Sequence, residues 1–187
     1  MTTTSRAIPT EPLAFLRWES RQRLRYELVG GAVRAMTGGT VGHNLLAARV
    51  MAALMRQLRP GCSVHQSDLK VVSPAGMVTY PDVLVRCGPI DEDATEVGDP
   101  LLIVEILLPS TRGEDLIRKR YRYQAIPSLR WLLYVEPKRV QVEVVTREPD
   151  DSWRSVLVTD LAATIKVEQL GVGLALAELY AGMAAAS

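Results

Sequence analysis

The 187-residue sequence predicts an α/β protein of the mixed α+β kind, in which a central mixed β-sheet is flanked by helices. Two observations predict this class. Segments with strand-like alternation occur in pairs between segments with helical periodicity, so the strictly alternating strand–helix units of a doubly wound parallel sheet are absent. In addition, the run Leu101–Leu108 lies between two prolines and is aliphatic apart from one glutamate. Its length and β-branched content fit a strand that is buried on both faces.

The N-terminal half is predicted to contain two helices and four strands. In order, we expect a helix at 13–24, a hairpin of strands 25–29 and 32–36, a helix at 41–58, strands at 62–73 and 78–86, and an acidic surface loop at 87–100. Gly30 and Gly31 can supply the positive φ angles that a tight hairpin turn needs. The apolar residues of 41–58 fall on one helical stripe, which Pro60 and Gly61 end.

The C-terminal half is predicted to begin with the aliphatic strand and to be rich in further strands. We expect a helix from Ser110 or Thr111 to about Gln124, a hairpin at 130–136 and 140–147, a strand at 153–159 and a short helix at 174–181. Thr111 and Glu114 have the spacing of a helix-capping box. No linker divides the chain, so a flexible tail at 1–12 should precede a single domain at 13–187.

Composition limits the classes of protein that this chain can belong to. Hydrophobic residues make up 48% and charged residues 23%, and the net charge is +1, so any contact with nucleic acid must come from a local patch. The N-terminus lacks the apolar core of a signal peptide, and no window approaches the ~20 apolar residues of a membrane span. We therefore expect a cytoplasmic protein without membrane contact. Cys62 and Cys87 are expected to be reduced, buried thiols.

Four acids lie inside otherwise apolar strand segments: Glu27, Asp68, Asp82 and Glu105. Burying an ionised carboxylate without a partner costs several kcal/mol or shifts its pKa. Asp82 follows Pro81, which lacks a backbone donor and suits an irregular position in a strand. Two carboxylates on neighbouring strands suit a hard cation such as Mg²⁺. The alternative is that each acid reaches solvent or an arginine.

The helix after the aliphatic strand can supply a cation. Asp115, Lys119 and Tyr123 are spaced i, i+4 and i+8, so they share one face, and Lys119 could reach back towards Glu105. The alternative is an exposed ion pair between Asp115 and Lys119. The same helix carries several arginines, which suit either a solvated face or a phosphate backbone.

The ordered set of these motifs resembles the PD-(D/E)XK nuclease superfamily and, within it, the Uma2 family, also known as DUF820. The resemblance covers residues 13–181. The segments that carry it are Tyr26–Gly31, Met36 with Gly38 and Gly39, His43 with Asn44, Ser67–Val71, Tyr80–Val83, Val104–Leu107, Pro109–Thr111, Asp115, Lys119, Tyr123 and Ile126–Leu129.

The resemblance implies a restriction-endonuclease-like fold with a metal site where Asp82 and Glu105 meet. In the superfamily a lysine stands two residues after the second acid, but here that residue is Leu107. The Uma2 pattern takes the lysine from the next helix, which gives Lys119, and Lys70 is a second candidate because it is expected on the same strand face as Asp68. Leu108 stands where a small polar residue is expected.

These residues give a mechanistic hypothesis. Asp82 and Glu105 would hold one Mg²⁺, or Mn²⁺ in its place, with Glu27 as a further ligand or a supporting carboxylate. Lys119 would stabilise developing charge or position the attacking water, and Asp115 and Tyr123 would orient it. His43 is either a phosphate or water contact or a helix-capping surface histidine.

The resemblance implies an endonuclease that acts on DNA as a homodimer without an organic cofactor, and the choice of DNA rests on the family alone. Two rival interpretations stay open. One is a nucleic-acid-binding or interaction module on the same fold whose catalysis is weak or lost. The other is a structural dimer whose buried carboxylates pair with arginines.

Overall fold

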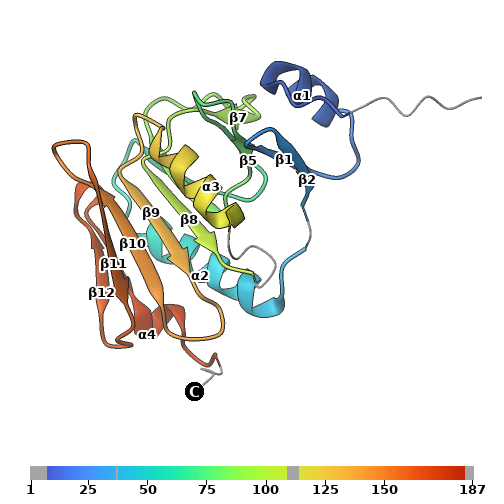
Figure 1. Ribbon diagram of the computed structural model, residues 1–187. Coiled ribbons are helices and arrows are strands. Elements are labelled where there is room, and N and C mark those ends of the chain that lie inside the picture. The colour runs from blue at the N-terminus through green and yellow to red at the C-terminus, as the bar shows by residue number, and fades with distance from the viewer. Residues whose placement is uncertain (1–7, 37, 109–113, 184–187) are drawn as a thin grey trace, which may run out of the picture.

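The computed structural model describes residues 8–36, 38–108 and 114–183, without the side chains of residues 114 and 115. Its strands form sheets of six, five and two strands, and helices flank them (Figure 1). The predicted mixed α+β class is therefore confirmed.

The six-stranded sheet forms the centre of the fold. Its spatial order is β11 (Trp153–Val158), β10 (Val142–Arg147), β9 (Trp131–Val135), β8 (Leu102–Ile106), β6 (Val83–Cys87) and β3 (Cys62–Gln66). The pair β8–β9 is parallel and the other neighbours are antiparallel, so the sheet is mixed. All of β8 is buried, as its aliphatic run predicts.

Two smaller sheets accompany the central one. The five-stranded sheet has the order β2 (Ala32–Ala35), β1 (Tyr26–Val29), β5 (Val78–Thr79), β4 (Lys70–Val72) and β7 (Glu96–Val97). The two-stranded sheet is the hairpin of β12 (Thr164–Val167) and β13 (Val172–Ala175), joined by the 3₁₀-helix Glu168–Leu170.

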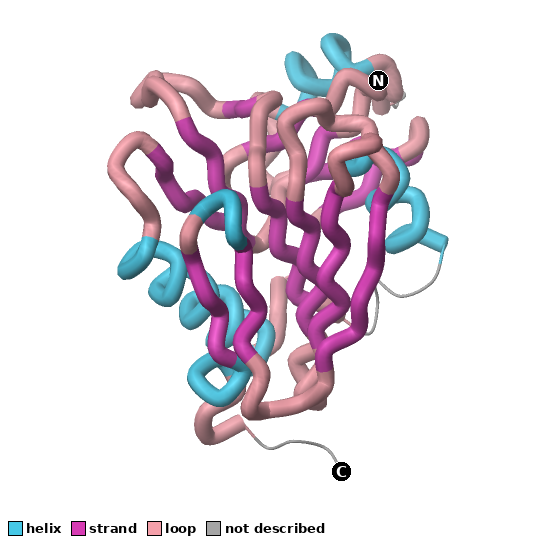
Figure 2. The backbone as a smooth tube through the Cα atoms, turned by 90° about the vertical axis from the view of Figure 1, so that its left-hand side faces the viewer, coloured by secondary structure: helices cyan, strands magenta, loops and turns pink. Residues whose placement is uncertain are grey.

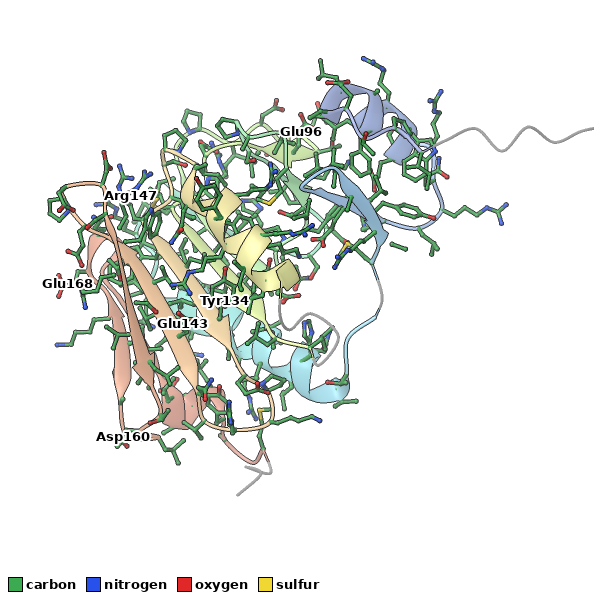
Figure 3. All side chains as sticks on the ribbon, in the orientation of Figure 1. Glu96, Tyr134, Glu143, Arg147, Asp160 and Glu168 are labelled. Carbon is green, nitrogen blue, oxygen red and sulfur yellow. A yellow bond between two sulfur atoms is a disulfide. The ribbon has the colours of Figure 1, made fainter. Side chains whose placement is uncertain are left out.

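The helices that contain residues 41–57 and 114–124 cover opposite faces of the six-stranded sheet (Figure 2). The helices are α1 (Pro12–Glu19), α2 (Val41–Gln57), α3 (Glu114–Gln124) and α4 (Leu176–Leu179). The α2 face of β8 packs Leu102, Val104 and Ile106, and its α3 face packs Ile103. Because side chains alternate along a strand, Glu105 lies on the α3 face. Side chains fill this interior, where Tyr134 of β9 lies opposite Glu143 of β10 (Figure 3).

Local sequence explains the elements that position the site. Gly30 and Gly31 both have positive φ, at 61° and 78°, and close the β1–β2 hairpin as predicted. Thr40 caps α2, because its Oγ1 accepts a hydrogen bond of 3.2 Å from the backbone N–H of His43. The apolar stripe of α2 is buried at Leu46, Val50, Ala53 and Leu54.

Two segments that we predicted to be continuous strands are broken. The strand predicted at 62–73 divides at residues 67–69 into β3 and β4, and the strand predicted at 78–86 divides at residues 80–82 into β5 and β6. In both cases the chain leaves one sheet and enters another. The two crossings lie together, since the N–H of Ser67 donates to the carbonyl of Asp82 at 3.3 Å.

Several element ends also differ from prediction. The first helix ends at Glu19 and not at residue 24, and the short strand β7 lies inside the predicted acidic loop. The hairpin β12–β13 was not predicted, and α4 begins at Leu176 because β13 occupies the preceding residues. The proposed capping box at Thr111 lies outside the described residues.

The prediction of reduced thiols is wrong. Cys62 and Cys87 stand directly opposite each other in the antiparallel pair β3–β6 and form a disulfide. The sequence shows only two cysteines 25 residues apart, and strand register, which brings them together, is not visible in that spacing.

None of the helices in the described part of the chain is long and apolar enough to cross a membrane.

Candidate active site

A cavity of about 270 Å³ lies beside the C-terminal end of β8, where the two larger sheets meet. It is lined by Glu27 from β1, His43 from α2, Asp82 from the segment before β6, Glu105 from β8 and Lys119 from α3. The break between β5 and β6 explains how Asp82 reaches the cavity. After Pro81 the chain is no longer in the ladder of β5, and the carboxylate turns towards the end of β8.

Asp82 is anchored through one carboxylate oxygen. Oδ2 accepts a 2.7 Å hydrogen bond from the backbone N–H of Ile106 and lies 3.2 Å from Nε2 of His43. The hydrogen bond with Asp82 raises the pKa of His43 above its usual value, and burial of the imidazole opposes that effect. Asp82 is therefore fixed to the last residue of β8, one position beyond Glu105.

Glu105 is the most deeply buried acid of the cavity. Its Oε1 accepts a 2.7 Å hydrogen bond from the phenol of Tyr123 and lies 3.6 Å from Nζ of Lys119. Burial raises the pKa of Glu105 to about 7, the charge of Lys119 opposes the rise, and the carboxylates of Asp82 and Glu27 add to it. Both protonation states of Glu105 are therefore accessible near neutral pH.

Lys119 bridges two carboxylates. Its Nζ lies 2.9 Å from each carboxylate oxygen of Glu27 and 3.6 Å from Glu105. Glu27 is held in turn by the backbone N–H of Tyr80, which donates to Oε1 at 3.2 Å. The side chains of Lys119 and Glu27 are only 12% and 13% exposed, so this ion pair is poorly screened by water.

Two other residues from the sequence hypothesis, Asp68 and Lys70, do not meet at the cavity. Asp68 lies in the turn between β3 and β4, and its 78% exposed carboxylate pairs with Arg25 at 2.9 Å. Lys70 directs its Nζ to Glu19, at 3.4 Å. The side chain of Asp115 lies outside the described residues. Of the two candidate lysines, the structure thus brings Lys119 to the cavity and leaves Lys70 elsewhere. We predicted that Asp68 and Lys70 lie on the same face of one strand. This prediction is wrong, because only Lys70 is in a strand.

The structure adds residues behind the site that the sequence did not single out. Glu19, only 5% exposed, accepts a 2.7 Å hydrogen bond from the phenol of Tyr80, so α1 is tied to the segment that leads into Asp82. Thr79 lies 2.9 Å from the phenol of Tyr123. The sequence signal for Glu19 was weak, since an acid in a helix is ordinary and its partner stands 61 residues away.

The donor set fits a hard divalent cation that takes few protein ligands. Oδ1 of Asp82 and Oε2 of Glu105 accept no hydrogen bond from any described residue, so both are available to a ligand in the cavity. Across the described residues, no group of three or more His, Cys, Asp or Glu side chains is arranged to hold a metal ion. Two carboxylates suffice for Mg²⁺, which keeps several waters and binds substrate phosphate oxygens.

A mixed sheet with acids and a lysine gathered at the end of a central strand defines the restriction-endonuclease-like class of folds. Within that class, the chain belongs to the Uma2 family, because the family model described as "Putative restriction endonuclease" matches residues 12–178.

Two further comparisons agree with this membership. The uncharacterized protein slr1290 of Synechocystis sp. is 33% identical over 178 residues, which cover 92% of each chain. The fold is similar to the crystal structure of a putative nuclease of DUF820 from Anabaena variabilis, with a TM-score of 0.75 and 15% identity. That match covers 92% of this chain and 98% of the other. At such low identity the second likeness supports the fold alone.

Proposed function

We propose that this protein is a metal-dependent endonuclease that hydrolyses phosphodiester bonds in DNA. The observation that carries the proposal is that Asp82, Glu105 and Lys119, which come from separate elements, line one cavity. The family description and the printed name of the structural neighbour, both of which refer to nucleases, agree with it. DNA as the substrate rests on the family description.

Each residue of the cavity has a role in this proposal. Asp82 and Glu105 hold Mg²⁺ or Mn²⁺ through their available oxygens, and Glu27 serves as a further ligand or as the partner that positions Lys119. A bound ion of this kind polarises a phosphoryl oxygen and lowers the pKa of a water molecule. Lys119 supplies positive charge next to the scissile phosphate. His43, held by Asp82, contacts a phosphate oxygen or the water.

A second candidate function is a nucleic-acid-binding module with lost or weak catalysis. Leu107 occupies the superfamily's usual lysine position, and Lys119 is held 2.9 Å from both oxygens of Glu27, which competes with any phosphate for its charge. Both features favour this alternative.

Cleavage and metal-binding measurements separate the two functions. The purified chain is incubated with supercoiled plasmid, linear duplex, single-stranded DNA and RNA in Mg²⁺, Mn²⁺ or EDTA, and Mn²⁺ binding is followed by calorimetry. We expect DNA to be cut only with a metal, and Asp82→Asn and Glu105→Gln to abolish cutting and weaken Mn²⁺ binding. Lys119→Met should abolish cutting but retain Mn²⁺ binding.

Glu178→Gln is the matched control, because Glu178 is an exposed acid that pairs with Arg56 away from the cavity. It should leave both readouts unchanged. If no nucleic acid is cut but DNA binds and Mn²⁺ binding still depends on Asp82, the binding module is the correct function. If Asp82→Asn and Glu105→Gln change neither cutting nor Mn²⁺ binding, the proposed site is wrong.

We also infer that the protein forms a homodimer. The supporting feature is the open edge of the six-stranded sheet, where Val156 and Leu157 of β11 are 42% and 57% exposed. An open strand edge with exposed aliphatic residues favours pairing with another chain. Light scattering after size-exclusion chromatography should give twice the monomer mass, and Leu157→Lys should shift the mass towards the monomer.

A further inference from the structure

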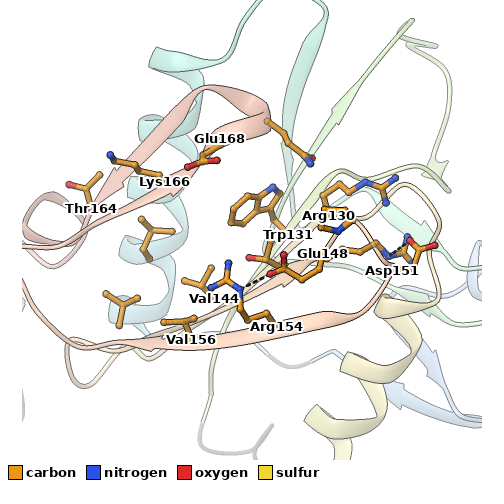
Figure 4. A pocket seen from close by; sticks show the side chains of 16 residues that line it. Arg130, Trp131, Val144, Glu148, Asp151, Arg154, Val156, Thr164, Lys166 and Glu168 are labelled. Atoms are coloured by element: carbon orange, nitrogen blue, oxygen red, sulfur yellow. Dashed lines mark hydrogen bonds and ion pairs between the residues drawn. The ribbon is translucent and has the colours of Figure 1, made fainter.

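A second cavity, of about 660 Å³, lies at the opposite end of the parallel pair β8–β9 from the candidate active site. It is lined by Trp131 at the start of β9, whereas the active-site residue Glu105 is near the end of β8. The walls are the β9–β10–β11 part of the large sheet and the strand β12 (Figure 4). This cavity is therefore separate from the site that we assign to phosphodiester hydrolysis.

Strand register gives the cavity an apolar floor. Val144 of β10 lies opposite Val156 of β11, and Val142 opposite Val158, so alternate positions place Val144, Val156 and Val158 on one face of the sheet. Ile165 of β12 lines the cavity from the other wall. In Figure 4 the indole of Trp131 stands between Val144 on β10 and Lys166 and Glu168 on the opposite wall.

Two donors at this cavity make no hydrogen bond to a described residue. In the described part of the chain, the buried side-chain polar atoms without a hydrogen bond are Nε1 of Trp131, Nε of Arg147 and the hydroxyl of Tyr134. Trp131 and Arg147 both line the cavity. A buried donor without an acceptor is costly and uncommon in folded proteins, and a bound ligand or water can supply the acceptor. Nε of Arg147 still has a carboxylate oxygen of Asp151 at 3.6 Å, so Nε1 of Trp131 is the donor that most needs an acceptor.

The charges around the cavity favour an anion. Arg154 is neutralised by Glu148 at 2.5 Å, and Arg147 has Asp151 at 3.6 Å. The guanidinium of Arg130 bonds only to the carbonyls of Pro127 and Leu129 among the described residues. Lys166 likewise makes no ion pair with a described residue. Two lining cations, Arg130 and Lys166, therefore make no ion pair with a described residue, whereas only one lining acid, Glu168, makes none. The lining thus carries an excess of positive charge.

We propose that this cavity binds a small organic anion that has an apolar body and a carboxylate, sulfonate or phosphate group. The apolar body packs against Val144, Val156 and Ile165. The anionic group accepts the hydrogen bond of Trp131 Nε1, and Arg130 and Lys166 contribute positive charge from opposite sides of Trp131 (Figure 4). The cavity volume lies within the range of about 300–1,000 Å³ typical of sites for small molecules. The proposal does not depend on the proposed nuclease function.

The test uses a pair of fluorescent probes that differ mainly in charge. The purified full chain is titrated with 1-anilinonaphthalene-8-sulfonate and, separately, with its uncharged analogue N-phenyl-1-naphthylamine. We expect saturable 1:1 binding of the sulfonate and at least tenfold weaker binding of the uncharged probe. Trp131→Phe removes the donor and retains an aromatic ring, and it should weaken sulfonate binding at least fivefold.

Two other variants keep the test decisive. Lys166→Glu changes an exposed side chain, so it should fold normally and weaken binding of the sulfonate but not of the uncharged probe. Trp18→Phe is the matched control, because Trp18 packs against Phe15 and Tyr26 at the N-terminal helix and should leave binding unchanged. The proposal is overturned if sulfonate binding does not saturate, if both probes bind equally well, or if Trp131→Phe and Lys166→Glu both bind like the unaltered chain.

Discussion

The phenol of Tyr123 lies 2.7 Å from Oε1 of Glu105 and 2.9 Å from Oγ1 of Thr79. A phenol has one hydrogen, and an ionised carboxylate can only accept, so Tyr123 donates to Glu105 and accepts from the Thr79 hydroxyl. The two bonds therefore run in one direction, from β5 through α3 to β8. This chain supports the charged form of Glu105 in a place where burial alone favours the protonated form.

Tyr123→Phe should destabilise the protein. The substitution leaves the Thr79 hydroxyl and Oε1 of Glu105 without the phenol in a buried position, which costs about 1–3 kcal/mol. Urea denaturation at neutral pH measures the loss. Tyr121→Phe is the control on the same helix, because Tyr121 is 78% exposed. It should change stability by less than about 0.5 kcal/mol. Equal stability of the Tyr123→Phe variant and the unaltered protein would contradict this account.

Lys119 and Glu27 should be strongly coupled in a double-mutant cycle. Lys119→Met alone leaves buried carboxylates without their cation, and it should cost about 3–5 kcal/mol. The double variant Lys119→Met/Glu27→Gln should recover part of that loss, with a coupling energy of about 1–3 kcal/mol from urea denaturation. The exposed pair Arg56–Glu178 is the reference cycle, and its coupling should stay below about 1 kcal/mol. Additive effects of the Lys119 and Glu27 substitutions would show that the pair contributes no stability.

Local patterns in the sequence predicted the elements that are defined by neighbouring residues. Gly30 and Gly31 indicated the hairpin because glycine readily adopts positive φ angles. The aliphatic run indicated β8 because apolar side chains occupy successive positions and therefore both faces of the strand. The stripe beginning at Leu46 indicated α2. In each case the physical cause lies within a few residues of the element itself.

The breaks between sheets could not be predicted in the same way. Alternation continues from β3 through Asp68 into β4, so the pattern gives no sign that the chain changes sheets there. That change is set by pairing with strands far along the chain, such as β6 for β3 and β5 for β4. The strand pair β12–β13 was missed because its short strands are joined through the 3₁₀-helix Glu168–Leu170, without the glycine pair that indicated the β1–β2 hairpin.

The sequence indicated which residue types could form the site but not how they pair. Glu27 and Lys119 are separated by 92 residues, and nothing local shows that they share an ion pair. Lys70 was a candidate by strand face, yet its partner Glu19 is in the first helix, which the sequence did not connect with the site. Family resemblance selected Lys119, and the fold explains how a lysine from α3 reaches β8.

Stability should fall as pH rises towards neutrality because of Glu105. Its pKa is raised from 4.5 to about 7 in the folded protein, so the folded state binds a proton more tightly than the unfolded state. The resulting stabilisation is present below about pH 4.5 and is lost between about pH 4.5 and 7. We expect Glu105→Gln to be more stable than the unaltered protein at pH 8, by on the order of 3 kcal/mol without added metal.

The measurement is the difference between the two proteins in urea denaturation from pH 5 to 8, in EDTA. Subtraction removes the titration of all other groups. Glu178→Gln serves as the control, since Glu178 is exposed, and its difference curve should be flat. A Glu105→Gln variant that is less stable than the unaltered protein at pH 8 would show that the ionised carboxylate is net favourable there.

The disulfide between Cys62 and Cys87 should contribute to stability. It joins the edge strand β3 to β6 and closes a loop with a sequence separation of 25. The bond restricts the conformations of the unfolded chain, which raises the free energy of unfolding by on the order of 3 kcal/mol. Reductant should therefore lower the urea midpoint, and a Cys62→Ala/Cys87→Ala variant should be equally destabilised and insensitive to reductant. Thiol titration of the denatured, unreduced protein should find no free thiol, and two thiols per chain would contradict the bond.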